Sequence, residues 1–369
     1  MLIKSQIKKV LCIIGTRPEA IKMAPVILGM KKDPDFDVKV LATAQHRELL
    51  DQVLSLFNII PDFDLNVMRS NQSLPDLTAR LVTSLDKCLE EINPDIVLAQ
   101  GDTTTVMVSA LAAFYRKIPF GHVEAGLRTG DVQNPFPEEM NRVVAGHLAQ
   151  WHFAPTQSTV DNLLKEGIAS SKIFKTGNTV IDALYKVIDA PNLTPPIIPA
   201  GKKMILVTAH RRENFGQPFE NICKAILALA KKYSDTCFFY PVHPNPNIKS
   251  VVDGLLGGHD QIILSEPLEY LQFVAAMKES YFIMSDSGGV QEEAPALGKP
   301  VLVLRNETER PEAVEEGCVK LVGTDYYKII HEASALLDDE DYFKSMAKGV
   351  SPYGDGQATA RILEALKQA

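Results

Sequence analysis

The chain has 369 residues, of which 46% are hydrophobic and 23% are charged, and its formal net charge is −8. This length predicts two domains of ordinary size, and the acidic balance argues against a general nucleic-acid binder. The sequence has no apolar run of about 18 residues for a membrane span and no signal-peptide pattern, so we expect a cytoplasmic protein. Five cysteines, an odd number set in apolar runs, predict reduced core side chains.

In the first half of the chain, short β-branched runs alternate with longer segments of helical period. This pattern is typical of a parallel sheet covered by helices. The clearer predicted strands are Val10–Ile14, Val38–Thr43, Ile96–Ala99 and Phe120–Val123. Apolar residues between Leu74 and Ile92 fall on one face of a predicted helix. We expect residues 1–175 to form an N-terminal Rossmann-like domain.

A second series of strands follows the segment APNLTPPIIPAG at 190–201, whose prolines exclude a helix interior or a central strand. The predicted strands are Met204–Thr208, Cys237–Pro241, Gln261–Leu264, Tyr281–Met284 and Pro300–Leu304. We expect residues 176–355 to form a C-terminal Rossmann-like domain, and a helix over 356–369 to pack back on the first domain. The predicted fold class is therefore α/β, with two doubly wound parallel sheets facing across a cleft.

Unusual polar residues follow the predicted strands in both halves. They are Gly15–Glu19, Gln45–Arg47, Gln100–Asp102, His122–Gly126, His210–Glu213, His243–Asn245, Ser285–Gly289 and Arg305–Arg310. Open α/β sheets bind ligands outside the carboxyl ends of their strands, so these groups can face one cleft. Helix caps and turn residues also collect at such junctions. That alternative fits Thr103 and Asn245, and it does not fit Arg17 or His210.

The turn Ser285-Asp286-Ser287-Gly288-Gly289 joins an apolar strand to a helix that carries Glu292 and Glu293. Adjacent glycines let a ligand approach the backbone, and the N-terminus of a helix favours an anion. A phosphate fits there, and Glu292 or Glu293 could accept hydrogen bonds from ribose hydroxyls. The alternative is a strand-to-helix turn whose glycines only relieve strain.

Arg17 lies between a Gly-Thr turn and Pro18, which suits the first turn of a helix. Its guanidinium can bind phosphate beside that helix N-terminus, or it can pair with Glu19 or another acid. Lys22 follows five residues later. It either adds a charge to the same site or is a solvated lysine on the helix surface.

Three carboxylates, Asp102, Glu124 and Glu138, follow strands or begin a helix in the first half and resemble an acid/base set. Carboxylates that lie close together in a closed cleft can titrate near neutral pH. The alternative is that Asp102 is only a helix cap, and that Glu138 pairs with Arg142 at i,i+4. For Glu139 we prefer the capping explanation.

His210 and His243 each follow a predicted strand of the second half and have no partners at zinc-ligand spacing, so no metal site is expected. Arg211 and Arg212 beside His210 suit an anionic ligand. The sequence contains no G-x-S-x-G, no P-loop and no early G-x-G-x-x-G motif. Serine hydrolases, P-loop NTPases and nicotinamide enzymes therefore lose support, and no cofactor is expected.

Eight blocks in order carry a family resemblance: IIGTRPEAIKMAPV, AQGDTTTV, HVEAGLRTGD, NPFPEEMNR, GN-T at 177–179, VTAHRREN, YPVHPNPN and SDSGGVQEEAPALGKPVLVLRNETERPEAV. Nearly end to end, the chain resembles the non-hydrolysing UDP-N-acetylglucosamine 2-epimerases. The resemblance implies a GT-B architecture, a homodimer, and reversible interconversion of UDP-N-acetylglucosamine and UDP-N-acetylmannosamine. It implies no role for nucleic acid or membrane.

The resemblance also implies roles for individual residues. The implied catalytic residues are Asp102, Glu124, Glu138, Arg142 and His210. The implied nucleotide-sugar binders are Arg17, Lys22, Phe273, Ser287, Gly288, Gly289, Glu293 and Arg310. Positions that match an activating second UDP-N-acetylglucosamine site in bacterial members are Gln45, Gln72, Glu138, Arg211 and His243. Leu268 stands where family members often have glutamine, so a side-chain contact to uridine is not expected there.

The chemistry of the implied reaction agrees with this set of residues. The C2 proton of the sugar is not acidic until the C1–O bond weakens, so cations must stabilise the departing UDP while a carboxylate takes that proton. Elimination then gives 2-acetamidoglucal and UDP, and re-addition completes the epimerisation. Three other readings stay open: a hydrolysing epimerase that releases UDP and N-acetylmannosamine, a GT-B glycosyltransferase, and a sensor of nucleotide sugars.

Overall fold

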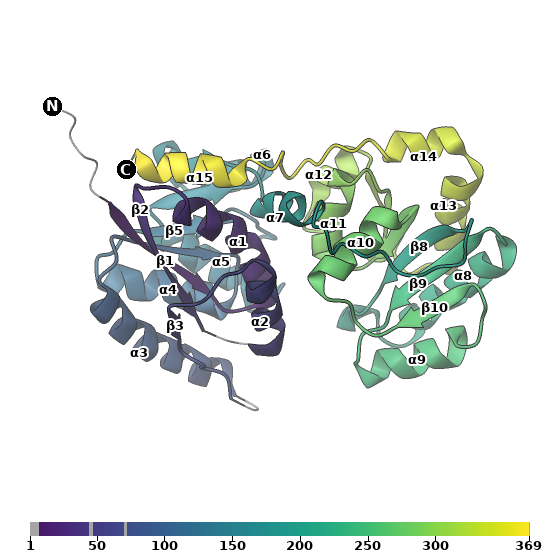
Figure 1. Ribbon diagram of the computed structural model, residues 1–369, viewed down its shortest axis with the longest axis horizontal. Helices are drawn as coiled ribbons and strands as arrows, with labels where there is room; N and C mark the ends of the chain where they lie inside the picture. The colour runs from purple at the N-terminus through teal and green to yellow at the C-terminus, as the bar shows by residue number, and fades with distance from the viewer. Residues whose placement is uncertain (1–6, 44–46, 70–71, 369) are drawn as a thin grey trace. The chain divides into compact units, whose positions relative to one another are not determined.

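The computed structural model describes residues 7–43, 47–69 and 72–368 (Figure 1). The chain divides into two compact units. Unit 1 is Met1–Lys186 together with Tyr353–Ala369, and unit 2 is Val187–Pro352. Among the residues that the structure describes, no helix combines the length and the apolar character needed to cross a membrane.

Unit 1 contains a seven-stranded sheet in the order β3-β2-β1-β4-β5-β6-β7, and each neighbouring pair is parallel. Its strands are β1 (Lys8–Ile14), β2 (Phe36–Ala42), β3 (Phe63–Asp64), β4 (Ile96–Gln100), β5 (Phe120–Val123), β6 (Trp151–Ala154) and β7 (Ile173–Lys175). The sheet reverses its direction of growth between β1 and β4. That point is where a doubly wound fold places its ligand.

Helices cover the sheet of unit 1. They are α1 (Arg17–Lys31), α2 (Arg47–Leu56), α3 (Leu74–Ile92), α4 (Thr104–Tyr115), α5 (Glu138–Leu148), α6 (Gln157–Lys165), α7 (Thr179–Val187) and α15 (Ala358–Lys367), with a 3-10 turn η1 (Ser170–Lys172). The leucines that predict an amphipathic helix in the sequence are buried in α3, where they pack with α4, α5 and one face of the sheet. Burial of this apolar stripe stabilises the packing of the helices against the sheet.

Unit 2 contains a six-stranded parallel sheet in the order β10-β9-β8-β11-β12-β13. Its strands are β8 (Lys203–Thr208), β9 (Thr236–Pro241), β10 (Ile262–Ser265), β11 (Phe282–Ser285), β12 (Val301–Val303) and β13 (Val319–Leu321). Its helices are α8 (Gln217–Lys232), α9 (Pro246–Leu256), α10 (Tyr270–Glu279), α11 (Gly288–Ala296), α12 (Pro311–Glu315), α13 (Tyr326–Asp338) and α14 (Glu340–Met346), with η2 (Arg212–Asn214). The reversal lies between β8 and β11.

The nine strands predicted from the sequence are all present, with ends that differ by at most two residues. Four short strands, β3, β6, β7 and β13, were not among them. Each has only two to four residues, and its pairing with a neighbouring strand defines it.

The boundary between the units differs from the expected one at 175/176. Residues 176–186 belong to unit 1 because α7 buries Val180, Ile181 and Leu184 there. The C-terminal helix α15 also belongs to unit 1, where it lies against α1 (Figure 1). Asp182 of α7 accepts hydrogen bonds from the backbone N–H groups of Ala358 and Thr359, at 3.2 and 2.8 Å. This carboxylate therefore caps α15 from a neighbouring helix.

Candidate functional site

In unit 1, the predicted site residues gather where β1, β4 and β5 end. Arg17 opens α1 after β1, Asp102 follows β4, and Glu124 follows β5. Since β1, β4 and β5 are neighbours in the sheet, their carboxyl ends form one continuous edge. This edge includes the reversal point of the sheet, as expected for a ligand site of a doubly wound fold.

Glu124 accepts hydrogen bonds from three side chains at this edge. Its two carboxylate oxygens accept hydrogen bonds from Lys22 Nζ, Gln100 Nε2 and, at 2.8 Å, Asn178 Nδ2. Its φ of +64° lies in the left-handed region, which costs a non-glycine residue roughly 1–2 kcal/mol. Such strain persists only where surrounding contacts enforce it, and it is concentrated at functional sites.

The position of Lys22 decides between the two interpretations of this lysine. It is 9% exposed and forms an ion pair with Glu124, so the reading as a solvated surface lysine is wrong. Gln100 and Asn178 are site residues that the sequence reasoning missed as individual side chains. Both lie in motifs that it singled out, AQGD and GN-T, but which donor meets which acid depends on contacts across the fold.

Asp102 forms a two-pronged contact with Arg142, whose Nε and Nη2 lie 3.0 and 2.7 Å from Oδ2. Arg142 also donates from Nη1 to Glu139 at 3.0 Å. Burial opposes the charge of Arg142, but the two carboxylates outweigh it and raise its pKa. The suggested i,i+4 pair of Arg142 with Glu138 is therefore wrong, because Asp102 and Glu139 are the partners of this arginine.

Glu139 is buried at 1% exposure, and it does more than sit in the first turn of α5. Its Oε1 accepts backbone N–H groups from Thr129 and Gly130 at 2.9 and 3.0 Å. The capping explanation preferred from the sequence is therefore incorrect in detail, since the acid holds the loop that precedes the helix. Glu138 at the start of α5 has no hydrogen bond or ion pair with the part of the chain that the structure describes.

A fifth acid, Glu19, lies at this edge and is 3% exposed. Its Oε2 accepts from the backbone N–H groups of Gly15 and Thr16, and its Oε1 accepts from Thr103 Oγ1 at 2.6 Å. Burial raises the pKa of Glu19 to about 7, against the hydrogen bonds and with a further contribution from nearby Asp102. Glu19 thus links the loop after β1 to the loop after β4.

His122 supports the same edge from within β5. Its Nε2 lies 2.7 Å from the carbonyl oxygen of Gly101, and burial lowers its pKa to about 3. The ring is therefore neutral and donates to Gly101, next to Asp102. This histidine has a structural role in holding the loop.

In unit 2, the turn that we predicted to bind an anion joins β11 to the start of α11. Ser287 is the N-cap residue, and no side chain caps the helix, so its first backbone N–H groups face outward without an intrahelical acceptor. The guanidinium of Arg310 covers Gly288 so closely that a Cβ there would lie 2.7 Å from Nη1. Gly288 is therefore required for this contact, and the helix N-terminus and the arginine favour an anion together.

The two glutamates of α11 differ in their partners. Glu292 accepts Arg310 Nε at 2.6 Å and is 1% exposed, so it positions the arginine. Glu293 is 7% exposed and accepts Tyr270 Oη at 3.4 Å. Of the two acids proposed for ribose, Glu292 is paired with Arg310, and Glu293 contacts Tyr270. Phe273 lies half-buried on α10.

His210, Arg211 and His243 gather around Asp286 in unit 2. The rings of His210 and His243 are stacked, with centroids 5.4 Å apart and planes 12° apart. Arg211 Nε donates to the backbone oxygen of Asp286 at 3.0 Å. Burial and the neighbouring His210 lower the pKa of His243, with Asp286 opposing them.

The residues predicted for a second nucleotide-sugar site are not all placed. Gln45 lies outside the described residues. Gln72 precedes α3 in unit 1, where its Oε1 accepts from Arg80 and from the backbone N–H of Arg69. Arg211 and His243 lie together in unit 2, as described above. Glu138 remains a candidate both for the catalytic set and for the second nucleotide-sugar site.

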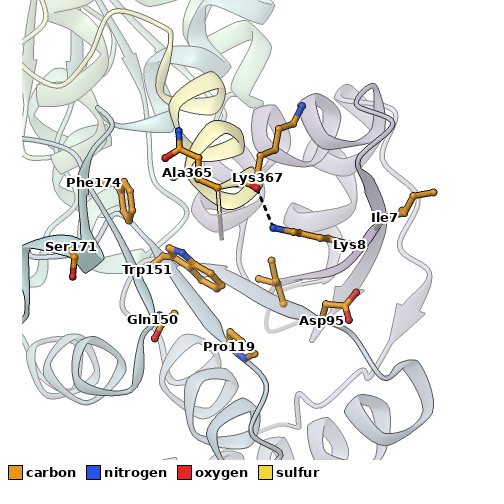
Figure 2. Close-up of a pocket in the computed structure, with 12 residues that line it drawn as sticks. Ile7, Lys8, Asp95, Pro119, Gln150, Trp151, Ser171, Phe174, Ala365 and Lys367 are labelled. Atoms are coloured by element: carbon orange, nitrogen blue, oxygen red, sulfur yellow. Dashed lines mark hydrogen bonds between the residues drawn. The ribbon is translucent and has the colours of Figure 1, made fainter. Parts of the chain in front are cut away.

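A pocket of about 930 Å³ lies at the opposite edge of the unit 1 sheet, at the amino ends of its strands (Figure 2). Trp151 and Phe174 form its apolar part, and Lys8 donates to the carbonyl oxygens of Leu366 and Lys367 at 2.7 and 3.4 Å. None of the predicted site residues that the structure describes lines it. Parallel sheets bind ligands at the other edge, so this pocket is not the candidate site.

Known proteins resemble this chain over almost its full length. The sequence model of the UDP-N-acetylglucosamine 2-epimerase family matches residues 29–367. The UDP-N-acetylglucosamine 2-epimerase of Escherichia coli K12 is 55% identical over 371 residues, which covers 97% of this chain and 98% of that protein.

Solved structures of the same family are also similar to this chain. The UDP-GlcNAc 2-epimerase of Neisseria meningitidis, bound to UDP-GlcNAc, is 51% identical with a TM-score of 0.90 and covers 98% of this chain and 100% of that chain. A glycotransferase of kitacinnamycin is 12% identical with a TM-score of 0.67, over 98% of this chain and 99% of that chain, which is a likeness of fold alone. The predicted fold class, two Rossmann-like parallel-sheet domains of the GT-B class, is confirmed.

Replacing Glu19 by glutamine tests the buried acid. The folded state raises the pKa of Glu19 from 4.5 to about 7. Protonation of Glu19 therefore contributes its full share to the free energy of unfolding below pH 4.5, and this contribution is lost as the pH rises through 7. Glutamine does not titrate. The free energy of unfolding of Glu19→Gln relative to wild type should therefore increase between pH 5 and 8, by roughly 2–3 kcal/mol, in urea titrations.

Glu364→Gln, an exposed change on α15, is the matched control and should follow wild type at every pH. A difference between Glu19→Gln and wild type that stays constant with pH would show that Glu19 does not titrate in this range.

Proposed function

Because the chain belongs to the UDP-N-acetylglucosamine 2-epimerase family, as the sequence motifs predicted, we propose that it interconverts UDP-N-acetylglucosamine and UDP-N-acetylmannosamine without hydrolysing them. The observation that carries the proposal is the set of acids at one sheet edge of unit 1. Asp102 and Glu124 are each paired with a cation, and Glu138 has an open carboxylate in the described structure.

Such a set suits a reaction that moves a proton at C2. We propose that the C1–O bond breaks first, with its electron pair leaving on UDP, while a carboxylate takes the C2 proton. The product is 2-acetamidoglucal. Re-addition of UDP at C1 and return of a proton to the opposite face of C2 then invert that carbon. Nothing is oxidised on this route, so it needs no nicotinamide.

The hydrogen bonds of the carboxylate oxygens suggest which acids transfer the proton. Both oxygens of Glu124 accept donors, whereas Oδ1 of Asp102 and both oxygens of Glu138 have no hydrogen-bond partner among the described residues. We assign proton transfer to Asp102 and Glu138. Glu124 then has to exchange one of its donors for substrate before it can accept a proton, and Arg142 orients Asp102.

The remaining predicted residues belong to nucleotide binding. We propose that the N-terminus of α11, with Ser287, Gly288 and Gly289, binds the diphosphate. The cations Arg17, Lys22 and Arg310 and the ring of His210 stabilise the charge on departing UDP. Glu293 binds the ribose, and Phe273 packs against the nucleoside. Support for these roles comes from the uncapped helix and from the packing of Arg310 on Gly288.

We also propose a homodimer in the cytoplasm. In unit 1, Phe114 and Tyr115 at the end of α4 and Met140 near the start of α5 are exposed, at 58%, 65% and 37%. Large apolar side chains of this kind usually mark a contact surface. In sedimentation velocity, the wild-type protein should have twice the mass of the 40.6 kDa chain. The Phe114→Glu variant should have the mass of a single chain. A wild-type monomer would refute the dimer.

A further prediction concerns the products of the reaction. Incubation with UDP-N-acetylglucosamine in deuterated water, without added cofactor, should give UDP-N-acetylmannosamine that carries deuterium at C2, because the proton exchanges with solvent during the reaction. NMR of the product measures this. Retention of protium at C2 would exclude the elimination route, and accumulation of UDP with free N-acetylmannosamine would instead identify a hydrolysing epimerase.

Variants of the three acids test which of them transfers a proton. Asp102→Asn and Glu138→Gln should lower turnover by ~10²–10⁴ if each transfers a proton. Their effects on stability should differ, because Asp102 loses charge-assisted bonds that contribute roughly 1.5–3 kcal/mol and Glu138 has none to lose. Glu124→Gln should lower both turnover and stability. Full activity in Glu138→Gln would remove that acid from the reaction.

A regulatory role is proposed for Gln45, Gln72, Arg211 and His243, as the positions of a second UDP-N-acetylglucosamine site. If they act in this way, the reaction that starts from UDP-N-acetylmannosamine alone should show a lag that a trace of UDP-N-acetylglucosamine removes. His243→Ala should abolish this activation. Progress curves without a lag in the wild type would contradict the proposal.

A further inference from the structure

Asp286 is a buried acid of unit 2 that the proposed reaction does not use. It follows β11, directly before the N-cap residue of α11, and is 0% exposed. Its Oδ2 accepts the backbone N–H groups of His210 and Arg211, both at 2.8 Å, and the Asn214 amide at 3.4 Å. This oxygen is therefore saturated by donors that hold the loop after β8.

The other carboxylate oxygen is in a different situation. Oδ1 of Asp286 is buried and has no hydrogen-bond partner among the described residues. Leaving a buried carboxylate oxygen unpaired is costly, so a donor is expected nearby. Nδ1 of His210 lies 3.6 Å away, just beyond hydrogen-bond distance. Such bonds are commonly long in unliganded sites and shorten when a ligand binds.

The surroundings of the His210 ring limit how it can turn. His243 stacks on one face, and the Nδ1 of His243 accepts the backbone N–H of Asn245 at 3.2 Å, which fixes that ring in turn. Arg211 is held by the backbone oxygen of Asp286. The side chain of His210 is still 42% exposed. One nitrogen therefore faces a buried acid, and the other is available to a ligand.

We propose that Asp286 is a positioning residue for His210. It accepts the Nδ1–H of the ring, so that Nε2 is the nitrogen presented to the diphosphate of the nucleotide sugar. The identity of this ligand rests on the proposed function. When the ring is protonated, Nε2–H donates to the diphosphate oxygen that receives the C1–O electron pair. The hydrogen bond strengthens as charge collects there, and the proton stays on nitrogen.

The simpler reading is that Asp286 only caps the loop at 210–211 through Oδ2. The two readings differ in what they predict for the His210 tautomer. A capping acid leaves the ring free to adopt either tautomer, whereas a positioning acid enforces Nδ1–H.

Histidine-selective ¹⁵N NMR of the full-length protein reads the tautomer directly, with the His210 signals identified from a His210→Gln spectrum. In the wild type at a pH where the ring is neutral, the Nδ1–H form should dominate. In Asp286→Asn, the backbone donors keep the amide oxygen on the Oδ2 side and turn the NH₂ group toward Nδ1. The ring should then change to the Nε2–H form.

Asn214→Ala is the matched control, because it removes a donor on Oδ2 without touching the side that faces His210. It should keep the Nδ1–H form. A wild-type ring in the Nε2–H form would overturn the proposal without reference to any variant, as would an Nδ1–H ring that persists in a folded Asp286→Asn protein.

Kinetics give a second and separate readout. Asp286→Asn should lower the turnover number by roughly 10- to 100-fold, with a smaller change in KM, as for other carboxylates that orient a histidine. Combining it with His210→Gln should add less than twofold to the loss caused by His210→Gln alone, because both changes remove one unit. Additive losses would contradict the proposal. If the wild type lacks epimerase activity, the proposed function fails while the tautomer result stands.

Discussion

The side chain of Glu124 depends on three donors that come from separate parts of unit 1, and the arrangement of the site in that unit follows from them. Lys22 belongs to α1, Gln100 ends β4, and Asn178 precedes α7. The left-handed backbone of Glu124 is tolerated because these contacts offset its cost. The same carboxylate therefore sets the position of a buried lysine and links the start of the fold to the segment at 176–186.

Asp286 has the corresponding role in unit 2. It binds the loop after β8 through one oxygen and lies against His210 with the other. Glu19 does the same between the loops after β1 and β4. In all three cases a buried acid satisfies backbone or amide donors that would otherwise be unpaired in a dry environment. These acids therefore hold loops at the edge of each parallel sheet through hydrogen bonds.

The sequence predicted the elements that build these edges much better than the contacts between them. Strands with β-branched runs were found, because burial on both faces leaves a recognisable pattern. The strand β6 was missed, since WHFA has no such run. Arg17 and Asp102 were found because both follow strands. Glu19 and Asp286 were not singled out, since their burial and partners depend on residues 80 or more positions away or on the packing of two loops.

The ion pairs within the protein affect how this acidic chain could bind the diphosphate of its proposed ligand. Most cations of the two edges already have acids beside them: Lys22 has Glu124, Arg142 has Asp102, and Arg310 has Glu292. A phosphate group has to compete with these acids for the same charges. The uncapped N-terminus of α11 and the exposed edge of His210 carry no such competitor among the described residues, apart from Asp286 behind the ring. In the proposed reaction these donors are held in place before the ligand arrives, so they would stabilise charge on the departing phosphate without first reorganising.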